Sequence, residues 1–166
     1  RLRVARLLTP VEANARGALD AHPLVREWFG DKLRQISEGG WRAAHARLYE
    51  YLKNSTREGK TPSLADLGPL YQAIVHGCCA GLHSEVLSKI FLNRICRGSE
   101  FYASHKLGAH GSNLAAMSWF FERVYETPMR TLSEADRSIV LTQAAVSLLA
   151  QGRLAEAVRP QRANLN

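Results

Sequence analysis

Two apolar helical stretches joined by a three-residue turn constrain this fold more than any other feature of the sequence. The first has apolar residues three and four positions apart, which gives a helix one apolar face. They are Leu64, Leu67, Tyr71, Ile74, Val75 and Cys78. The second stretch, with its apolar residues Val86, Leu87, Ile90, Phe91 and Ile95, follows Gly81-Leu82-His83 and extends to Cys96. Helices with so short a link must pack antiparallel.

The same pattern returns near the end of the chain. Residues 80–87 align with residues 151–158, so that Gly81 matches Gly152 and Glu85 matches Glu156. The offset of 71 residues is close to two units of about 34, the tetratricopeptide period. Ser63 with Asp66, and Ser133 with Asp136, have the form of capping boxes at two helix starts.

Between the two matching segments we expect one irregular helical hairpin. It comprises residues 99–107 and 112–124, joined through Gly108 and Gly111. The expected buried residues of the hairpin are Leu114, Met117, Phe121 and Val124. The predicted fold is therefore mainly α, a right-handed superhelix of antiparallel helix pairs whose concave side is free to bind.

A different pattern precedes these helices. Val4–Leu8 and Gly17–Ala21 are predicted to be paired strands, and Pro23 suits the first turn of a helix that runs to about Ile36. His22 would lie just before that helix, where free N–H groups and the helix dipole favour an anion such as phosphate. The apolar face of this helix is expected to pack inward. It comprises Leu24, Val25, Trp28 and Phe29.

Gly39-Gly40 interrupts the helical pattern, and we place a domain boundary there, with residues 1–38 before it and residues 39–166 after it. From this point a further helix is expected, because apolar positions again follow helical spacing. They are Trp41, His45, Leu48 and Leu52. A polar loop over residues 54–62 ends it.

Residues 19–27 resemble the end of the winged-helix domain in STAND-type signalling ATPases, the class that contains NB-ARC and NACHT regulators. In that family a Met-His-Asp motif places its histidine near the β-phosphate of bound ADP. His22 corresponds to that histidine, while Ala21 and Pro23 stand in place of the methionine and the aspartate. Residues 41–52 resemble the first helix of the tetratricopeptide-like array that follows this domain in bacterial members.

The resemblance implies a non-catalytic regulatory and sensor region that keeps a signalling ATPase closed until a trigger binds. The implied partners are a protein or peptide trigger and the upstream ATPase domain, and oligomerisation would belong to the full-length protein. ADP or ATP is expected in that parent, and no cofactor in this chain. We read the chain as an excised fragment, because it begins at Arg1 and a helical pattern runs to Asn166. We expect a cytoplasmic location, since no run approaches the roughly 20 apolar residues of a membrane helix.

Two alternatives remain beside this hypothesis. The first is a tetratricopeptide-like interaction scaffold from another multidomain protein. The second is a winged-helix DNA-binding module, suggested by a net charge of +7 and by Arg1, Arg3 and Arg6 near one end. Most later basic residues alternate with acidic ones, which favours a solvated surface over a nucleic-acid interface.

Three patterns resemble a phosphate-binding, a zinc-binding or a catalytic site, but the surrounding residues argue against each. Gly59-Lys60-Thr61 resembles the end of a P-loop, but Asn54 stands where the motif needs glycine and Pro62 follows it. The candidate zinc ligands are His76, Cys79, His83 and Cys96. They lack the Cys-x-x-Cys pairing of structural zinc sites, and we expect no metal. Vicinal cysteines within an apolar helix stay protonated, so we expect no enzymatic activity.

A surface for a peptide or protein partner is the remaining candidate. Near the end of the expected helix over residues 99–107 and in the turn that follows it, aromatic side chains lie beside polar side chains that we expect to be exposed. This combination is typical of binding surfaces. These residues are Phe101, Tyr102, His105, Lys106 and His110.

Overall fold

The computed structural model describes residues 8–10 and 19–164. The chain divides into two compact units, Arg1–Ala43 and Ala44–Asn166. Most of the described chain is helical, and each unit also holds a small two-stranded antiparallel sheet. The boundary between the units lies within one helix, after Ala43, five residues beyond the predicted boundary.

The first unit contains the predicted hairpin and helix. Strand β1 (Leu8–Pro10) pairs antiparallel with β2 (Leu19–Ala21), with Thr9 opposite Asp20. Leu8 and Leu19–Ala21 are strand residues as predicted, and β1 extends beyond its predicted end to Pro10; residues 4–7 and 17–18 of the two predicted strands lie outside the described residues. Helix α1 (Pro23–Ile36) follows directly, with its predicted start and end.

The apolar face of α1 differs from the prediction. No residue of α1 is buried, and Leu24, Trp28 and Phe29 are 67%, 56% and 60% exposed. The expected inward packing is therefore absent from the described structure. A two-stranded sheet and one further turn of helix offer too little apolar surface to cover such a face.

Helix α2 (Glu38–Ser55) contains both Gly39 and Gly40, so the break between helices lies at Ser37. A glycine within a helix costs about 1 kcal/mol but does not prevent the helix from forming. The buried position of α2 is also shifted by one residue. Tyr49 is fully buried, whereas Leu48 is 45% exposed.

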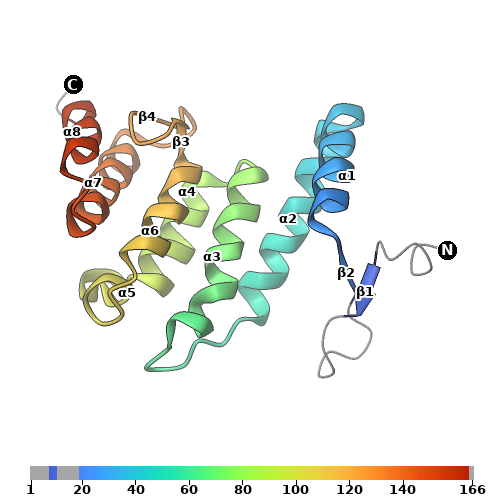
Figure 1. Cartoon of the computed structure of the whole chain (residues 1–166), viewed down its shortest axis with the longest axis horizontal. Coiled ribbons are helices and arrows are strands. Elements are labelled where there is room, and N and C mark those ends of the chain that lie inside the picture. Colours follow the sequence, from blue (N-terminus) through green and yellow to red (C-terminus); the bar gives the residue numbers. More distant parts are fainter. Residues whose placement is uncertain (1–7, 11–18, 165–166) are drawn as a thin grey trace. The chain divides into compact units, whose positions relative to one another are not determined.

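The second unit is a series of helices that lie side by side in Figure 1. After α2 come α3 (Leu64–Cys79), α4 (His83–Val86) and the π-helix η1 (Leu87–Ile95). The 3-10 turn η2 (Gly98–Glu100), α5 (Tyr102–His105) and α6 (His110–Met117) follow. The chain then forms η3 (Ser118–Phe120), strands β3 (Phe121–Arg123) and β4 (Thr127–Pro128), and helices α7 (Glu134–Ala150) and α8 (Leu154–Ala163).

The two segments that align in sequence have matching structures. Helices α3 and α7 end at Cys79 and Ala150, and α4 and α8 begin at His83 and Leu154, each pair 71 residues apart. In both turns the residue after the glycine donates its backbone N–H to a carbonyl five residues earlier. Leu82 donates to the carbonyl of Gly77, and Arg153 donates to the carbonyl of Leu148. Gly81 and Gly152 have φ of +84° and +72°, which glycine adopts without strain.

Part of the predicted middle hairpin is not helical. Helix α6 ends at Met117, and the chain turns into the β3–β4 hairpin, where Val124 is 51% exposed and not buried. Residues 120–125 include several aromatic and β-branched residues, which fit a strand better than a helix. Likewise, the predicted helix over residues 99–107 is reduced to η2 and the four residues of α5.

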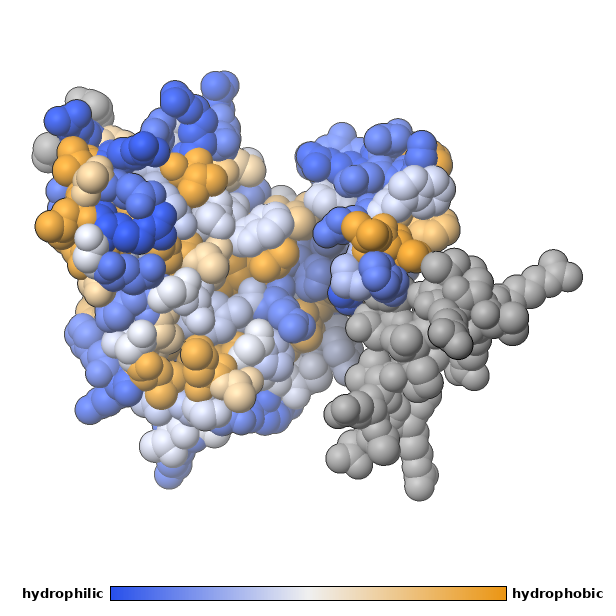
Figure 2. All heavy atoms as spheres, viewed as in Figure 1, coloured by the Kyte–Doolittle hydropathy of each residue, from blue (hydrophilic) through white to orange (hydrophobic). Residues whose placement is uncertain are grey.

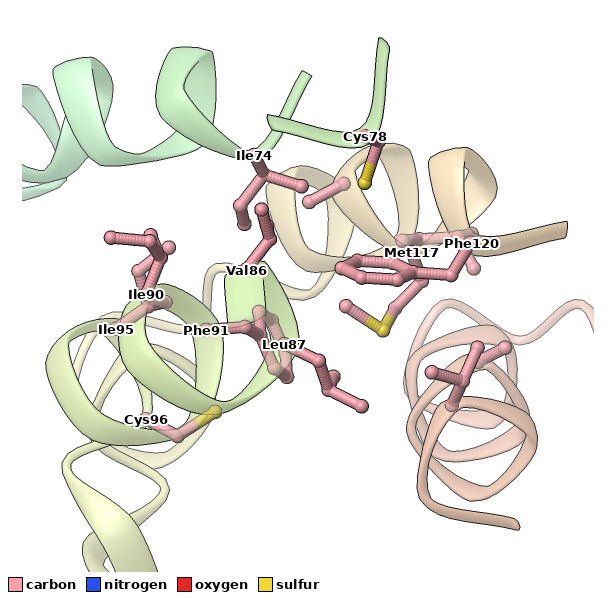
Figure 3. Close-up of a cluster of buried hydrophobic side chains, with 14 of the residues drawn as sticks. Ile74, Cys78, Val86, Leu87, Ile90, Phe91, Ile95, Cys96, Met117 and Phe120 are labelled. Carbon is pink, nitrogen blue, oxygen red and sulfur yellow. The ribbon is translucent and has the colours of Figure 1, made fainter. Parts of the chain in front are cut away.

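The core of the second unit lies where α3, α4, η1 and α6 meet. Figure 3 shows Ile74, Val86 and Phe91 directed toward one another, with Met117 and Phe120 from the α6 segment on the far side. All five side chains are fully buried. This core holds α5 and α6 in place, and thus fixes the position of the predicted partner surface.

Candidate functional site

A cavity of about 250 Å³ lies among α5, α6 and α7. Its lining residues are Phe101, Ser104, His105, His110, Thr142, Gln143 and Val146. The structure thus brings together three of the five residues predicted to form a partner surface, namely Phe101, His105 and His110. We call this the Phe101 cavity.

Phe101 enters the cavity from an unusual backbone conformation. Its φ of +46° lies in the left-handed region, which costs a bulky residue roughly 1–2 kcal/mol. Arg97, at the other end of η2, has φ of +58°. Backbone strain of this kind persists only where surrounding structure enforces it, and it clusters at functional sites.

The ring of Phe101 is held against its neighbour one turn later. Its centroid lies 5.5 Å from that of His105, with the two planes tilted by 51°. The backbone carbonyl of Phe101 accepts a hydrogen bond from the N–H of His105 at 2.8 Å. Two flat rings thus form one wall of the cavity, and half-exposed Val146 of α7 contributes an apolar patch.

A hydrogen-bond chain fixes the adjoining wall. Ser104 Oγ accepts from Asn113 Nδ2 at 3.0 Å, and Asn113 Oδ1 accepts from the Tyr71 hydroxyl at 2.6 Å. His110 Nδ1 is buried and has no hydrogen-bond partner among the described residues. Because a buried N–H without an acceptor costs about 1–3 kcal/mol, the His110 proton belongs on Nε2. The ring then offers a donor on its other side.

The other two predicted residues lie apart from the cavity lining. Tyr102 donates its hydroxyl proton to the carbonyl of Pro62 at 3.2 Å, and the Arg97 guanidinium lies 4.7 Å from its ring centroid. Tyr102 therefore anchors the loop before α3. Lys106 is exposed at the surface of the turn after α5.

Three lining residues were not predicted from the sequence. Thr142, Gln143 and Val146 come from α7, about 40 positions after Phe101. In the sequence, Thr142 and Val146 lie one turn apart on the same side of α7 as Ile139 and Leu149, and that pattern does not mark a cavity wall. Only the packing of α7 on α6 shows that these residues of α7 border the Phe101 cavity.

A second, more apolar groove of about 380 Å³ runs between α3 and α6. Its walls include Leu64, Tyr71 and Val75 on α3, and Ala116 and Trp119 on the α6 side. Trp119 is 43% exposed. Figure 2 shows hydrophobic atoms reaching the surface of this unit between hydrophilic stretches.

The loop containing Gly59-Lys60-Thr61 is held by arginine side chains. Arg97 donates to the carbonyls of Gly59 and Lys60, and Arg94 donates to the carbonyls of Lys53 and Thr56. The carbonyls of this loop thus face guanidinium groups. A phosphate cradle instead requires backbone N–H groups at the start of a helix.

The four candidate zinc ligands have separate surroundings. Nδ1 of His76 lies 2.9 Å from Nδ1 of His45, and Nδ1 of His83 lies 3.0 Å from the Thr131 hydroxyl. Burial raises the pKa of the Cys96 thiol to about 12. Among residues 8–10 and 19–164, no three potential ligands come together to hold a metal ion.

His22 caps α1 in the described structure. Its Nδ1 accepts a hydrogen bond from the N–H of Leu24 at 3.3 Å, which satisfies one free donor of the first helical turn. No acidic side chain occupies that turn. The N–H groups of Val25 and Arg26 bond to the carbonyl of His22 at 2.8 and 3.1 Å, and Pro23 has no N–H, so each donor of that turn is already paired.

Family models, curated proteins and solved structures give no match to this chain. None of the described helices combines the length and apolar character needed to cross a bilayer.

Proposed function

We propose that the second unit is a non-catalytic protein-interaction module that binds a short peptide segment of a partner in the Phe101 cavity. The observation that carries this proposal is the strained backbone of Phe101 at the cavity wall. A backbone conformation with negative φ would place the Phe101 ring elsewhere. The strained conformation therefore keeps the ring at the cavity wall at a cost in stability, which is typical of functional sites.

The lining suits a side chain with an apolar body and a polar tip. The rings of Phe101 and His105 and the methyl groups of Val146 offer apolar contact. Thr142 and Gln143 can donate and accept hydrogen bonds. No carboxylate lines the cavity in the described structure. Solenoid proteins bind partners along extended concave surfaces in the same way, and a few anchoring side chains supply most of the binding energy.

A displayed library of random peptides tests this proposal. The wild-type protein would select peptides, an unrelated protein would remove nonspecific binders, and the affinity of the rest for each variant would then be measured. We expect the remaining peptides to bind Phe101→Ala about 30-fold more weakly, the loss typical of an aromatic hot spot of about 2 kcal/mol. Lys106→Ala is the matched control, because Lys106 is adjacent but does not line the cavity. Equal binding to both variants would contradict the proposal.

A regulatory role in a STAND-type ATPase is the second proposal, with the helix pairs stacked as a tetratricopeptide-like superhelix. Its support is the order of a β-hairpin, His22 and α1, together with the acid-free first turn of α1. ADP binding by the longer parent protein tests it. If His22 senses nucleotide, both His22→Ala and His22→Asn weaken ADP binding. If His22 only caps the helix, Asn preserves ADP affinity, since Asn is among the preferred N-cap residues.

A further inference from the structure

A pair of histidine rings joins α2 to α3 within the second unit. Nδ1 of His45 lies 2.9 Å from Nδ1 of His76, and the ring centroids are 5.0 Å apart. At this distance one nitrogen must be an N–H donor and the other must accept through its lone pair. The neutral rings therefore have different tautomers, one with its proton on Nδ1 and the other with its proton on Nε2.

The distance between the two Nδ1 atoms fits a hydrogen bond better than joint coordination of a metal ion. Two histidine nitrogens bound at 2.0–2.1 Å to a tetrahedral zinc ion would lie roughly 3.4 Å apart. The separation of 2.9 Å is shorter than that and falls within the usual hydrogen-bond range.

The charges around the pair do not favour an imidazolium. One turn from the two rings lie Arg42 and Tyr49 on α2 and Cys79 on α3, and α4 adds Glu85. Glu85 accepts from the Tyr49 hydroxyl at 3.2 Å and pairs with Lys53 and Lys89. Burial lowers the pKa of both histidines, and the His76 ring lowers the pKa of His45 further.

The first added proton leaves the contact intact. It enters at Nε2 of the ring that donates through Nδ1, and the bond becomes an imidazolium–imidazole hydrogen bond. The second added proton must take the lone pair of the accepting Nδ1. It removes the hydrogen bond and leaves two cations face to face, which repel each other in a partly buried site.

We propose that His45 and His76 form a proton-operated latch, which holds α2 on α3 at neutral pH and releases it when the pair is doubly protonated in acidic surroundings. Helix α2 buries only one side chain, that of Tyr49. The His45–His76 bond adds to contacts one to two turns further along α2, where Tyr49 and Lys53 pair with Glu85 and the Lys53 carbonyl accepts from Arg94. Because α2 also runs from the first unit into the second, the latch acts on the helix that connects the two.

Thermal unfolding from pH 7.5 to pH 5 tests the latch. In the unfolded chain both rings take up protons near pH 6.5, whereas the folded pair resists, so stability falls as the pH falls through that value. We expect the wild-type melting temperature to drop by roughly 4 °C or more. The His45→Asn/His76→Asn variant, whose amides can hydrogen-bond without titrating, should lose less than half as much. The control His22→Asn should behave as the wild type does.

Ring-nitrogen NMR on the unmodified protein gives a second readout, which remains decisive if the double variant fails to fold. We expect one ring protonated on Nδ1, the other on Nε2, and two separate protonation steps. Two identical Nε2–H tautomers that titrate together would overturn the proposal. The same pH dependence in the wild type and the double variant would overturn it as well.

Discussion

Gly77 of α3 and Val86 of α4 lie so close that a Cβ atom on the glycine would stand 2.2 Å from Cγ2 of the valine. The same Cβ would lie 3.0 Å from Cδ2 of the Tyr49 ring. Gly77 therefore lets three helices meet at one point in the core. Its carbonyl also accepts the N–H of Leu82, which closes the turn between α3 and α4.

We predict that Gly77→Ala destabilises the second unit by about 1–3 kcal/mol, because the added methyl group overpacks a closed contact. Chemical denaturation monitored by circular dichroism measures this difference. Gly68→Ala in the same helix is the control, since a Cβ there meets nothing within 4 Å. It should stabilise the protein by about 0.5–1 kcal/mol. A Gly77→Ala protein as stable as the wild type would show that the three helices are not tightly packed.

At Phe101 we predict an inverted order of stability. Phe101→Gly should be about 1 kcal/mol more stable than Phe101→Ala, because both lack the ring but only glycine adopts φ of +46° without strain. At His105, which is helical, the order should be the usual one, with alanine more stable than glycine. Equilibrium unfolding curves of the four variants measure these differences in stability. Alanine favoured at both positions would mean that Phe101 is not strained.

One ion pair at the loop before α3 should make a measurable contribution to stability. Arg94 Nε donates to Glu58 at 2.7 Å, and this hydrogen bond lowers the pKa of the Glu58 carboxyl. Both side chains are mostly buried. We predict that Glu58→Gln costs about 1.5–3 kcal/mol at pH 7, the usual contribution of a hydrogen bond to a charged group.

The pH dependence of this loss follows from the sign of the shift. A carboxyl whose pKa is lowered by folding stabilises the protein above its unfolded pKa of about 4.3, and that stability is lost as the pH falls through the folded value. The difference between wild type and Glu58→Gln should therefore shrink toward pH 3. Glu122→Gln, at an exposed pair 3.6 Å from Arg130, is the control and should change stability by less than about 1 kcal/mol. A difference that stays constant with pH would refute this assignment.

Local signals predicted most of the helices. The starts of α3 and α7 follow from Ser63 and Ser133, whose hydroxyls accept the N–H of Asp66 and Asp136. The carboxylate of Asp66 also accepts the N–H of Ser63, which completes the predicted capping box. The turns follow from Gly81 and Gly152, which adopt positive φ. Each of these signals acts within five residues, so the sequence contains it directly.

What the sequence did not reveal depends on contacts between distant segments. Tyr49 rather than Leu48 is buried because Gly77 leaves room for its ring. The left-handed Phe101 shortens the predicted helix, and no residue pattern around it signals positive φ. The cavity itself needed α7 beside α5 and α6, and single-sequence periodicity does not specify which helices become neighbours.

Chemical-shift mapping with a selected peptide tests the central claim most directly. Phe101 and Val146 are 45 positions apart and share only the cavity, so a peptide bound there must perturb both α5 and α7. We predict that the amide signals of Phe101, His105, Thr142 and Val146 shift together and saturate at one affinity. Shifts confined to the Trp119 groove, or spread over the surface without saturation, would contradict binding in the Phe101 cavity.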